Sequence, residues 1–485
     1  MNLTIREIAE ACGGKLTGGN AAEYDKCVSS VVIDSRKVEA GGVFLATIGE
    51  RVDGHKFISQ AFSAGAVLAV SQKTPEQLAV ETGTEGMNRG CYCVVEDTLQ
   101  ALKDIAEFYR RKVGIPVVGI TGSVGKTSTK EFIAGVLAEK YRVLKTEGNY
   151  NNEIGVPLTL LRIRPEHQVA VVEMGISDFG EMHRLSKMAR PDVCVITNIG
   201  QCHLENLKTR DGILKAKSEI FDFMAENGEI CLNGEDDKLK EVSEVNGHKP
   251  HFFGLGGNEN EEVFAGEIVS HGLSGSDAVL HIFGETDSGE KRISVQVPLP
   301  GKHMVLNAAA AACVGRIFGL SEQEIARGIA GIEPVSGRNH LISLKYCTLI
   351  DDCYNANPAS MRAAIDLLGM ADTEKIAILG DMFELGENSD ALHAGVGEYA
   401  VNAGLNRLYC VGENARHMYE AATALAGEET AVEYFPDRDS LLDSLKNHLR
   451  EYLPEGCTVL LKASHGMEFG RLLESIPLLI ENNVH

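Results

Sequence analysis

The stretch "VVGITGSVGKTSTKEF" (117–132) joins an apolar run to a glycine-rich turn and a helix-like segment that begins at Lys126. A phosphate loop has the pattern G-x-x-x-x-G-K-[ST]. Here Ile120 stands where that pattern has its first glycine, and Gly119 lies one place too early. The strand, the turn and the helix start remain, and together they direct backbone N–H groups and the helix dipole at phosphate oxygens. We therefore favour a phosphate loop over a plain glycine turn.

The loop predicts an ATP site. In such loops the lysine reaches the β and γ phosphates and the hydroxyl after it binds Mg²⁺. These roles fall on Lys126 and Thr127. The residues expected to bind ATP are Gly122, Ser123, Val124, Gly125, Lys126, Thr127 and Ser128.

The chain has 485 residues, which suggests about three domains. The runs "IPVVGIT", "HQVAVVEMG" and "DVCVITNIG" are almost wholly apolar, as in a parallel sheet that is buried on both faces. Residues 250–300 alternate instead and predict an antiparallel edge or subsheet. Further apolar strands separated by helices follow residue 336, which indicates a second open sheet. We expect an α/β protein with domains at 1–112, 113–335 and 336–485.

Composition narrows the class of protein. The net charge of −23 disfavours nucleic acid and anionic membranes as partners, although a local basic pocket could still bind an anionic substrate. The N-terminus does not resemble a signal peptide, and no apolar run approaches the roughly 18 residues of a transmembrane helix. The twelve cysteines lack zinc spacing. We expect buried free thiols in a cytoplasmic protein without membrane insertion.

Polar residues at strand ends mark a candidate site. Glu173 closes "VAVVE", and His203 follows "DVCVITNIGQC", so both would lie at the carboxyl edge of the sheet. Taken alone, Glu173 could cap a strand in solvent and His203 could be a packing or surface residue. Composition assigns Lys217, in "GILKAKSEIF", to solvent. The uncharged asparagines Asn149, Asn151 and Asn152 suit substrate binding, although turns also collect asparagine.

A family resemblance connects these stretches. "ITGSVGKTST", "EGNYNNEIGVPLTLL", "EMG", "TNIGQCHLE", "KAKSEIF", "PGKHMVLNAAAAA" and "DDCYNANPASM" occur in the order seen in the Mur ligases, the ATP-dependent amide ligases of peptidoglycan precursor synthesis. The resemblance covers all three domains. "DSRKVEAGGVFLATIGERVDGHKFISQAFSAGA" and "ILGDMFELGENS" most resemble the member that joins D-alanyl-D-alanine to UDP-N-acetylmuramoyl-tripeptide.

The resemblance implies a role for each domain. It implies a small substrate domain for the UDP-sugar, a central ATP-binding ligase domain and a C-terminal Rossmann-like domain in a monomer. It also implies two Mg²⁺ ions, held by Thr127, Glu173, His203 and a carbamylated Lys217. Lys126, Glu173, His203 and Lys217 would then be catalytic.

The resemblance further implies ligand contacts. Asn307 resembles an adenine-contacting residue, Arg338 one that reaches the γ-phosphate, and Asp352 one that reaches the ribose. His465 stands where the family pattern suggests arginine, so the partner of the dipeptide carboxylate stays open. The residues expected at the substrates are Asp34, Ser35, Arg36, Arg51, Asp53, Gly54, His55, Asn149, Asn151, Asn152, Asn355 and Asn357.

Such a ligase phosphorylates a carboxylate, and the acyl phosphate is then attacked by an amine. Alternatives are another Mur ligase, a folylpolyglutamate synthase-like ligase or a nucleotide-dependent switch. The switch would need an N-K-x-D guanine-reading motif, which the sequence lacks. A non-catalytic nucleotide-binding module would not need Glu173 and His203 at strand ends. The third residue of the tripeptide, diaminopimelate or lysine, stays open.

Overall fold

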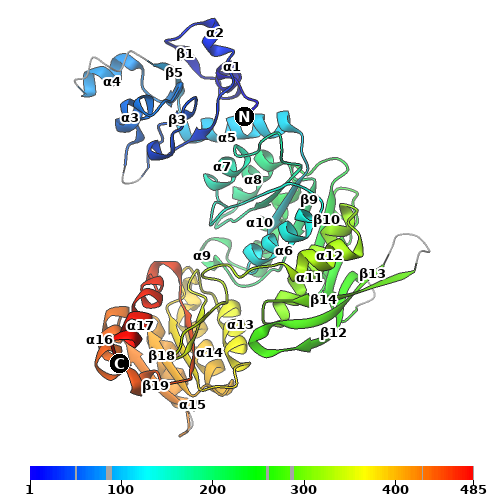
Figure 1. Cartoon of the computed structure of the whole chain (residues 1–485), viewed down its shortest axis with the longest axis vertical. Coiled ribbons are helices and arrows are strands. Elements are labelled where there is room, and N and C mark those ends of the chain that lie inside the picture. The colour runs from blue at the N-terminus through cyan, green and yellow to red at the C-terminus, as the bar shows by residue number, and fades with distance from the viewer. Residues whose placement is uncertain (50–51, 83–89, 258–260, 284–288, 429, 484–485) are drawn as a thin grey trace.

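The computed structural model of the chain describes residues 1–49, 52–82, 90–257, 261–283, 289–428 and 430–483, and within these ranges three β-sheets follow one another along the chain. Figure 1 shows the first sheet at one end of the long axis, the third at the other end and the second between them. Helices flank the sheets, so the predicted α/β class is confirmed.

The first sheet is parallel except at β1, which runs antiparallel to β5. Gly65 (φ 105°) separates the helix α3 from the buried strand β4. In spatial order the strands are β1 (Lys15–Thr17), β5 (Cys91–Val94), β4 (Leu68–Ser71), β3 (Val43–Leu45) and β2 (Val31–Val32). The helices are α1 (Ile5–Ala11), α2 (Ala21–Tyr24), α3 (Ile58–Ser63) and α4 (Pro75–Thr82).

Helix α5 (Thr98–Val113) connects the first sheet to the second. Its start is capped by Asp97 and its end by Gly114 in the left-handed conformation (φ 63°). It packs against α1 and also against α7 (Gly155–Leu160) and α8 (Glu181–Ala189) of the next unit. The buried hydroxyl of Tyr109 donates to the carbonyl of Ile163 at 2.7 Å. The helix therefore anchors the first unit on the second, as Figure 1 shows.

The strands of the second sheet from β6 to β11 are mutually parallel, and all except the edge strand β7 are buried along almost their whole length. Val118 and Ile120 of β6 pack in one core with α6 and α11, and Val117 packs in the other core with α5, α7 and α8. This arrangement explains why the sequence runs are continuously apolar rather than alternating. In spatial order the strands are β14 (Glu290–Val297), β13 (Ser276–Phe283), β12 (Glu261–Ser270), β11 (His251–Leu255), β10 (Glu229–Asn233), β9 (Val193–Ile196), β6 (Val117–Thr121), β8 (Val169–Glu173) and β7 (Val143–Lys145).

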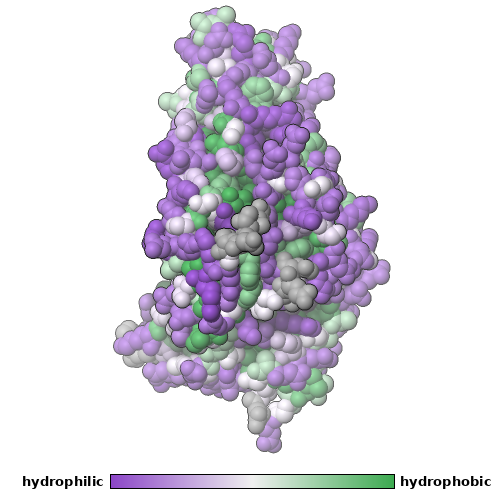
Figure 2. Space-filling view, turned by 90° about the vertical axis from the view of Figure 1, so that its right-hand side faces the viewer, coloured by the Kyte–Doolittle hydropathy of each residue, from purple (hydrophilic) through white to green (hydrophobic). Residues whose placement is uncertain are grey.

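The alternating region is an antiparallel extension of this same sheet, so the predicted edge is correct and a separate subsheet is not formed. In β14, Ile293, Val295 and Val297 are buried, whereas Lys291 and Arg292 are exposed. Charges on an edge strand discourage pairing with other chains. Figure 2, turned toward this side of the molecule, shows mostly hydrophilic residues with hydrophobic ones scattered among them.

The second sheet carries most of the helices that position the site. The alanine-rich helix is α11, whose small side chains let it lie close to α6. The remaining helices of this unit are α6 (Lys126–Ala138), α9 (Leu204–Leu207), α10 (Arg210–Ser218), α11 (Lys302–Ile317) and α12 (Glu322–Ala330).

The third sheet is parallel except where β15 pairs with β16. Its strands alternate with helices, as predicted for the region after residue 336. In spatial order they are β15 (His340–Ser343), β16 (Thr348–Asp351), β20 (Thr458–Lys462), β17 (Lys375–Gly380), β18 (Arg407–Val411) and β19 (Ala431–Phe435). The helices are α13 (Pro358–Gly369), α14 (Ser389–Asn402), α15 (Ala415–Leu425), α16 (Arg438–Tyr452) and α17 (Gly470–Asn483).

The structure also bears on the expectations about membrane-spanning helices and about the cysteines. None of the described helices is long and apolar enough to cross a bilayer. The twelve cysteines are all free; ten are buried, Cys12 is half-buried and Cys27 is exposed. The expectation of buried thiols therefore holds for all but these two residues.

Candidate active site

The loop between β6 and α6 turns at two glycines with positive φ. Gly122 has φ 152°, and a Cβ atom there would lie 1.9 Å from the hydroxyl of Thr197. Gly125, with φ 82°, is the N-cap of α6. A side chain is excluded at Gly122 by contact and disfavoured at Gly125 by conformation. The glycine spacing, which differs from the usual phosphate-loop pattern, therefore belongs to a loop that packs against Thr197 where the chain leaves β6.

The segment after β9 holds this loop in place. The amides of Ser123 and Val124 donate to the backbone carbonyl and side-chain oxygen of Asn198, at 3.0 and 2.9 Å. The side chains of Thr197 and Asn198 both donate to the carbonyl of Val124. The first amides of α6 have no partner within the helix. The N–H groups from Gly125 to Ser128 are therefore the ones left for a phosphate, while the amides of Ser123 and Val124 serve the loop itself.

A main cavity of about 620 Å³ opens in front of the loop, between the second and third sheets. It brings together predicted residues from six separate stretches of sequence. These are Ser123, Val124, Gly125, Lys126, Thr127, Asn149, Asn151, Asn152, Glu173, His203, Arg338, Asn355 and Asn357. Gly122 and Lys217 do not line it.

Glu173 lies at the carboxyl end of β8 and is 1% exposed. Its Oε1 accepts a hydrogen bond from Asn151 at 2.8 Å, while its Oε2 has no partner. A buried carboxylate oxygen without a partner is unfavourable. It suits a hard cation such as Mg²⁺, which prefers oxygen ligands and keeps several waters. Glu173, Thr127 and His203 therefore fit such an ion.

Few acidic or histidine side chains among the described residues surround Glu173. Within the described ranges, no group of three or more His, Cys, Asp and Glu side chains is placed to hold a metal ion. The predicted ligand set contains only Glu173 and His203 of these types. A metal bound at Glu173 would therefore depend on hydroxyl, water and phosphate oxygens as well as on protein carboxylate.

His203 contacts the third unit. Its backbone is left-handed (φ 51°), and its Nδ1 lies 2.5 Å from Oε2 of Glu384. Glu384 follows β17 and is also left-handed (φ 62°). The hydrogen bond from His203 lowers the pKa of Glu384. Sequence reasoning missed Glu384, although it lies inside the quoted family stretch "ILGDMFELGENS" and directly after a strand.

Lys217, on α10, is 1% exposed, so its interpretation as a solvated lysine was wrong. Its side-chain amine makes no hydrogen bond or ion pair with any residue that the structure describes. Burial lowers its pKa to about 8, and the charge of Lys126 acts in the same direction. A buried amine with a shifted pKa and no acidic partner is typical of a functional site.

An inner cavity of about 120 Å³ lies behind the loop, and its lining includes Ser128, Asn307 and Asp352. Asn307 accepts a hydrogen bond from the hydroxyl of Thr129 at 2.9 Å. Asp352 accepts one from the buried Lys462 at 2.5 Å. Sequence reasoning did not assign Lys462, although a lysine that ends an apolar strand was a visible signal.

Arg338 lines both cavities. Its guanidinium lies 3.8 Å from the ring centroid of Tyr354, and it donates to the hydroxyl of Thr127 at 3.3 Å. The planar group is therefore held over the start of α6, where a bound phosphate would meet it. The role of Arg338 at the γ-phosphate stays a prediction.

The asparagines of the main cavity differ in availability. Asn152 caps α7 by accepting from the amide of Gly155 at 2.9 Å, and Asn357 caps α13 by accepting from the amide of Ser360 at 2.9 Å. Asn151 orients Glu173. Asn152 and Asn357 therefore have the local turn role that the sequence left open, and substrate binding by these asparagines stays a prediction.

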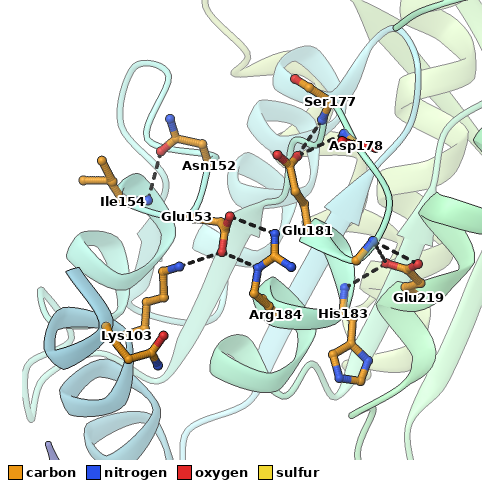
Figure 3. A network of polar contacts seen from close by, with 12 residues as sticks. Lys103, Asn152, Glu153, Ile154, Ser177, Asp178, Glu181, His183, Arg184 and Glu219 are labelled. Atoms are coloured by element: carbon orange, nitrogen blue, oxygen red, sulfur yellow. Dashed lines mark hydrogen bonds and ion pairs between the residues drawn. The ribbon is translucent and has the colours of Figure 1, made fainter. Parts of the chain in front are cut away.

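A charged network stiffens the rim of the main cavity (Figure 3). Glu153 accepts from Lys103 of α5 at 2.7 Å and from two nitrogens of Arg184 of α8 at 2.6 and 3.1 Å. Glu181 accepts from the amides of Ser177 and Asp178. Glu153 and Glu181 both line the cavity. The first unit is thereby connected to the rim through α5.

The N-terminal candidates lie outside both cavities. Asp34 binds its neighbour Arg36, whose hydrogen bond lowers the pKa of Asp34 to about 2. His55 is buried, accepts from the amide of Gln72 at Nε2 and therefore donates from Nδ1 to Asp53. Ser35 is buried, Gly54 donates its amide to Thr47, and Arg51 lies outside the described residues.

Known proteins resemble this chain along its whole length. Family models match in chain order: the Mur ligase family catalytic domain at 28–110, the Mur ligase middle domain at 120–315 and the Mur ligase glutamate ligase domain at 337–465. The UDP-N-acetylmuramoyl-tripeptide–D-alanyl-D-alanine ligase of Bacillus subtilis (strain 168) is 34% identical over 98% of each chain. The chain belongs to the Mur ligase family.

Solved structures agree with this Mur ligase along most of its length. MurF from Acinetobacter baumannii is 31% identical and superposes with a TM-score of 0.85, covering 98% of this chain and 99% of the other. MurF ligase from Thermotoga maritima, solved in complex with ADP, is 30% identical with a TM-score of 0.77, covering 93% and 98%. The phosphate loop of this Mur ligase therefore belongs to a fold with a nucleotide-bound relative.

Proposed function

We propose that this Mur ligase joins D-alanyl-D-alanine to UDP-N-acetylmuramoyl-tripeptide with hydrolysis of ATP to ADP and phosphate, in cytoplasmic peptidoglycan precursor synthesis. The observation that carries the proposal is the main cavity. It places a phosphate loop, an unpartnered buried carboxylate oxygen and a guanidinium from the third unit around one space. The activity for which the relatives are named then indicates which carboxylate and which amine meet there.

The chemistry follows from the poor reactivity of a carboxylate. A carboxylate oxygen attacks the γ-phosphorus, the bond to the β-phosphate oxygen breaks, and ADP leaves. The amine then attacks the carbonyl carbon of the acyl phosphate, phosphate leaves with the bonding electron pair, and the amine nitrogen loses one proton to solvent. Positioning and charge neutralisation supply most of the rate enhancement in phosphoryl transfer.

The chain's own groups perform the positioning. The first amides of α6 bind phosphate oxygens, and Lys126 exchanges its present acceptor, the carbonyl of Gly122 at 2.7 Å, for the β and γ phosphates. Arg338 neutralises the γ-phosphate from the opposite side. Ser128, Asn307 and Asp352 hold the nucleoside in the inner cavity.

Two Mg²⁺ ions would be held by Thr127, Glu173, His203 and a carbamylated Lys217. When bound, they neutralise the charge of the transferring phosphoryl group. Lys217 acquires its carboxyl group when its neutral amine attacks CO₂, forming an N–C bond and releasing one proton. Its lowered pKa, about 8 instead of 10.5, raises the neutral fraction at pH 7 roughly 300-fold, since each pH unit is a factor of ten.

The three units divide the substrates. The described residues Asp34 to Arg36 and Asp53 to His55, with Arg51, bind the UDP-sugar on the first unit, and the asparagines of the main cavity bind the peptide. The proposed domains are 1–112, 113–335 and 336–485, in a monomer. Because the tripeptide precursor is long, its UDP end can rest on the first unit while its carboxylate reaches the phosphate loop.

Phosphate release with different amines tests this function. With ATP, Mg²⁺ and UDP-N-acetylmuramoyl-tripeptide present, D-alanyl-D-alanine should trigger release, whereas D-alanine or glutamate should leave it near background. Release driven equally by a single amino acid would identify a sister ligase instead. Release without any amine would identify a nucleotide hydrolase.

A further inference from the structure

Two cysteines connect the end of α1 with β5 in the first unit. The Sγ atom of Cys12, the C-cap of α1, lies 3.8 Å from the Sγ atom of Cys93, which is 81 residues further along the chain in β5. Gly14 packs against this pair, because a Cβ atom there would lie 2.2 Å from the sulfur of Cys93 and 3.3 Å from that of Cys12. The absence of a side chain at Gly14 therefore leaves the space that the two sulfur atoms occupy.

The two thiols differ in their access to solvent. Cys12 is half-buried, whereas Cys93 is completely buried. The thiol of Cys12 donates to the carbonyl of Ile8 at 3.0 Å, which leaves the thiol of Cys93 to donate to the sulfur of Cys12. This hydrogen bond from Cys93 lowers the pKa of Cys12. An accessible cysteine with a lowered pKa beside a second, resolving cysteine is the arrangement typical of thiols that oxidants attack.

Other thiols of the chain also meet but are less accessible. The sulfur atoms of Cys231 and Cys313 lie 3.5 Å apart, and Cys457 forms a hydrogen bond with Cys347. These four side chains are at most 4% exposed. An oxidant must reach a sulfur atom before it can react, so contact between thiols is not sufficient. Of these pairs, the one at the end of α1 combines contact with access.

We propose that Cys12 and Cys93 form an oxidation site at which hydrogen peroxide closes a disulfide between α1 and β5. The Cys12 thiolate attacks one peroxide oxygen, the O–O bond breaks, and hydroxide leaves with the electron pair, so that Cys12 becomes a sulfenic acid. The sulfur of Cys93 then attacks the sulfur of Cys12, the S–O bond breaks, and the leaving hydroxide takes the Cys93 proton as water. Two thiols are oxidised and one peroxide is reduced to two waters. Reduction by small thiols in a cytoplasm would make this disulfide transient.

The disulfide would enclose most of the first unit. Its sulfur atoms must approach to about 2 Å, and the moving residue stands at a helix end before Gly13 and Gly14 rather than inside an element. The residues proposed to bind the UDP-sugar, 34–36, 51 and 53–55, lie between the two cysteines in the chain. A crosslink across so long a loop restricts the unfolded chain and stabilises the fold. Oxidation should therefore raise the melting temperature.

Peptide mapping of the full chain tests this site. The reduced protein is treated with hydrogen peroxide, the peroxide is removed with catalase, and the remaining thiols are alkylated in denaturant. Digestion without reduction and mass spectrometry then identify the linked peptides. The proteins are the wild type, Cys12→Ser, Cys93→Ser and the matched control Cys91→Ser, which changes a buried cysteine two positions away on the same strand. Cys27→Ser removes the exposed thiol as a second control.

The wild type and both controls should yield the peptide of Cys12 linked to that of Cys93, and their melting temperature should rise until a reductant is added. Cys12→Ser and Cys93→Ser should show neither effect, and Cys93→Ser should keep a sulfenic acid at Cys12 that dimedone labels. Cys12 recovered as a free thiol or a sulfinic acid from the treated wild type would overturn the proposal. Equal linkage of Cys231 to Cys313 would also overturn it, because access would then not select the site. A linked wild type with an unchanged melting temperature would overturn the stabilising role.

Discussion

Glu173 and Lys217 are buried charged residues that lack an ion-pair partner in the described part of the chain. A buried ionisable group normally acquires a partner or becomes neutral, because desolvation disfavours its charged form. Glu173 retains one unpartnered oxygen, and Lys217 has a lowered pKa. The unpartnered oxygen of Glu173 therefore suits binding of a cation. The lowered pKa of the Lys217 amine suits addition of a carboxyl group.

The carbamate proposal predicts a rescue at Lys217. Lys217→Ala should lower ligation by about 100-fold or more, because the variant removes an anionic oxygen donor from the phosphoryl-transfer site. A small carboxylic acid such as acetate, added at millimolar concentration, should restore part of the rate by occupying the vacated space. Ligation is measured by phosphate release with both substrates at saturation.

A matched control for this experiment is Lys215→Ala, which removes an exposed lysine from the same helix. It should retain wild-type activity and show no response to acetate. Full activity in Lys217→Ala would rule out the carbamate, and equal acetate stimulation of both variants would rule out the rescue.

At the residue scale, the sequence predicts the groups that stand next to a recognisable element. Lys126, Glu173 and His203 follow apolar strands, so their place at the sheet edge could be inferred. Glu384 and Lys462 could not be assigned in the same way. Their roles depend on partners 181 and 110 residues away in the chain, His203 and Asp352. Burial of Lys217 was likewise invisible to composition and came only from the resemblance.

At the element scale, the phosphate loop depends on its contact with the segment after β9. Gly122→Ala would place a Cβ atom 1.9 Å from the hydroxyl of Thr197 at φ 152°, so the loop or that segment must move. Strain of this kind costs about 1–3 kcal/mol. The variant should lose that much stability in urea unfolding and should bind ATP more weakly in titration calorimetry.

Gly114→Ala is the control, because it adds a side chain at a glycine with positive φ without creating a close contact. Gly114 also has positive φ (63°), and a Cβ atom there would meet nothing within 4 Å. This variant should show only the smaller left-handed strain, about 1–2 kcal/mol, and should bind ATP normally. Equal ATP affinity in Gly122→Ala and the wild type would show that the loop does not need its present path.

The positions of helices and strands along the chain were easier to predict than their packing partners. Apolar runs located the parallel strands of the second sheet, and the glycine turn before Lys126 located the start of α6, because each depends on local sequence. That α5 would pack on α7 and α8 could not be predicted, since an amphipathic pattern shows that a face is buried but not against what. The strand pairing of β12 to β14 with the main sheet was open for the same reason.

At the scale of the whole molecule, the site is assembled from separate units. The second unit supplies the loop, Glu173 and His203, and the third supplies Arg338, Asp352 and Glu384. The first unit reaches the cavity rim only through α5 and Lys103 in the described part of the chain (Figure 3). The three substrates of the reaction can therefore reach a single phosphate loop from different units of the molecule.

Oxygen transfer tests this reaction most directly. UDP-N-acetylmuramoyl-tripeptide labelled with ¹⁸O in its terminal carboxylate is ligated to D-alanyl-D-alanine with unlabelled ATP, and the released phosphate is examined by mass spectrometry. If the carboxylate attacks the γ-phosphorus and phosphate later leaves from the carbonyl carbon, each phosphate should carry one ¹⁸O atom. Amide formation accompanied by wholly unlabelled phosphate would contradict an acyl phosphate intermediate.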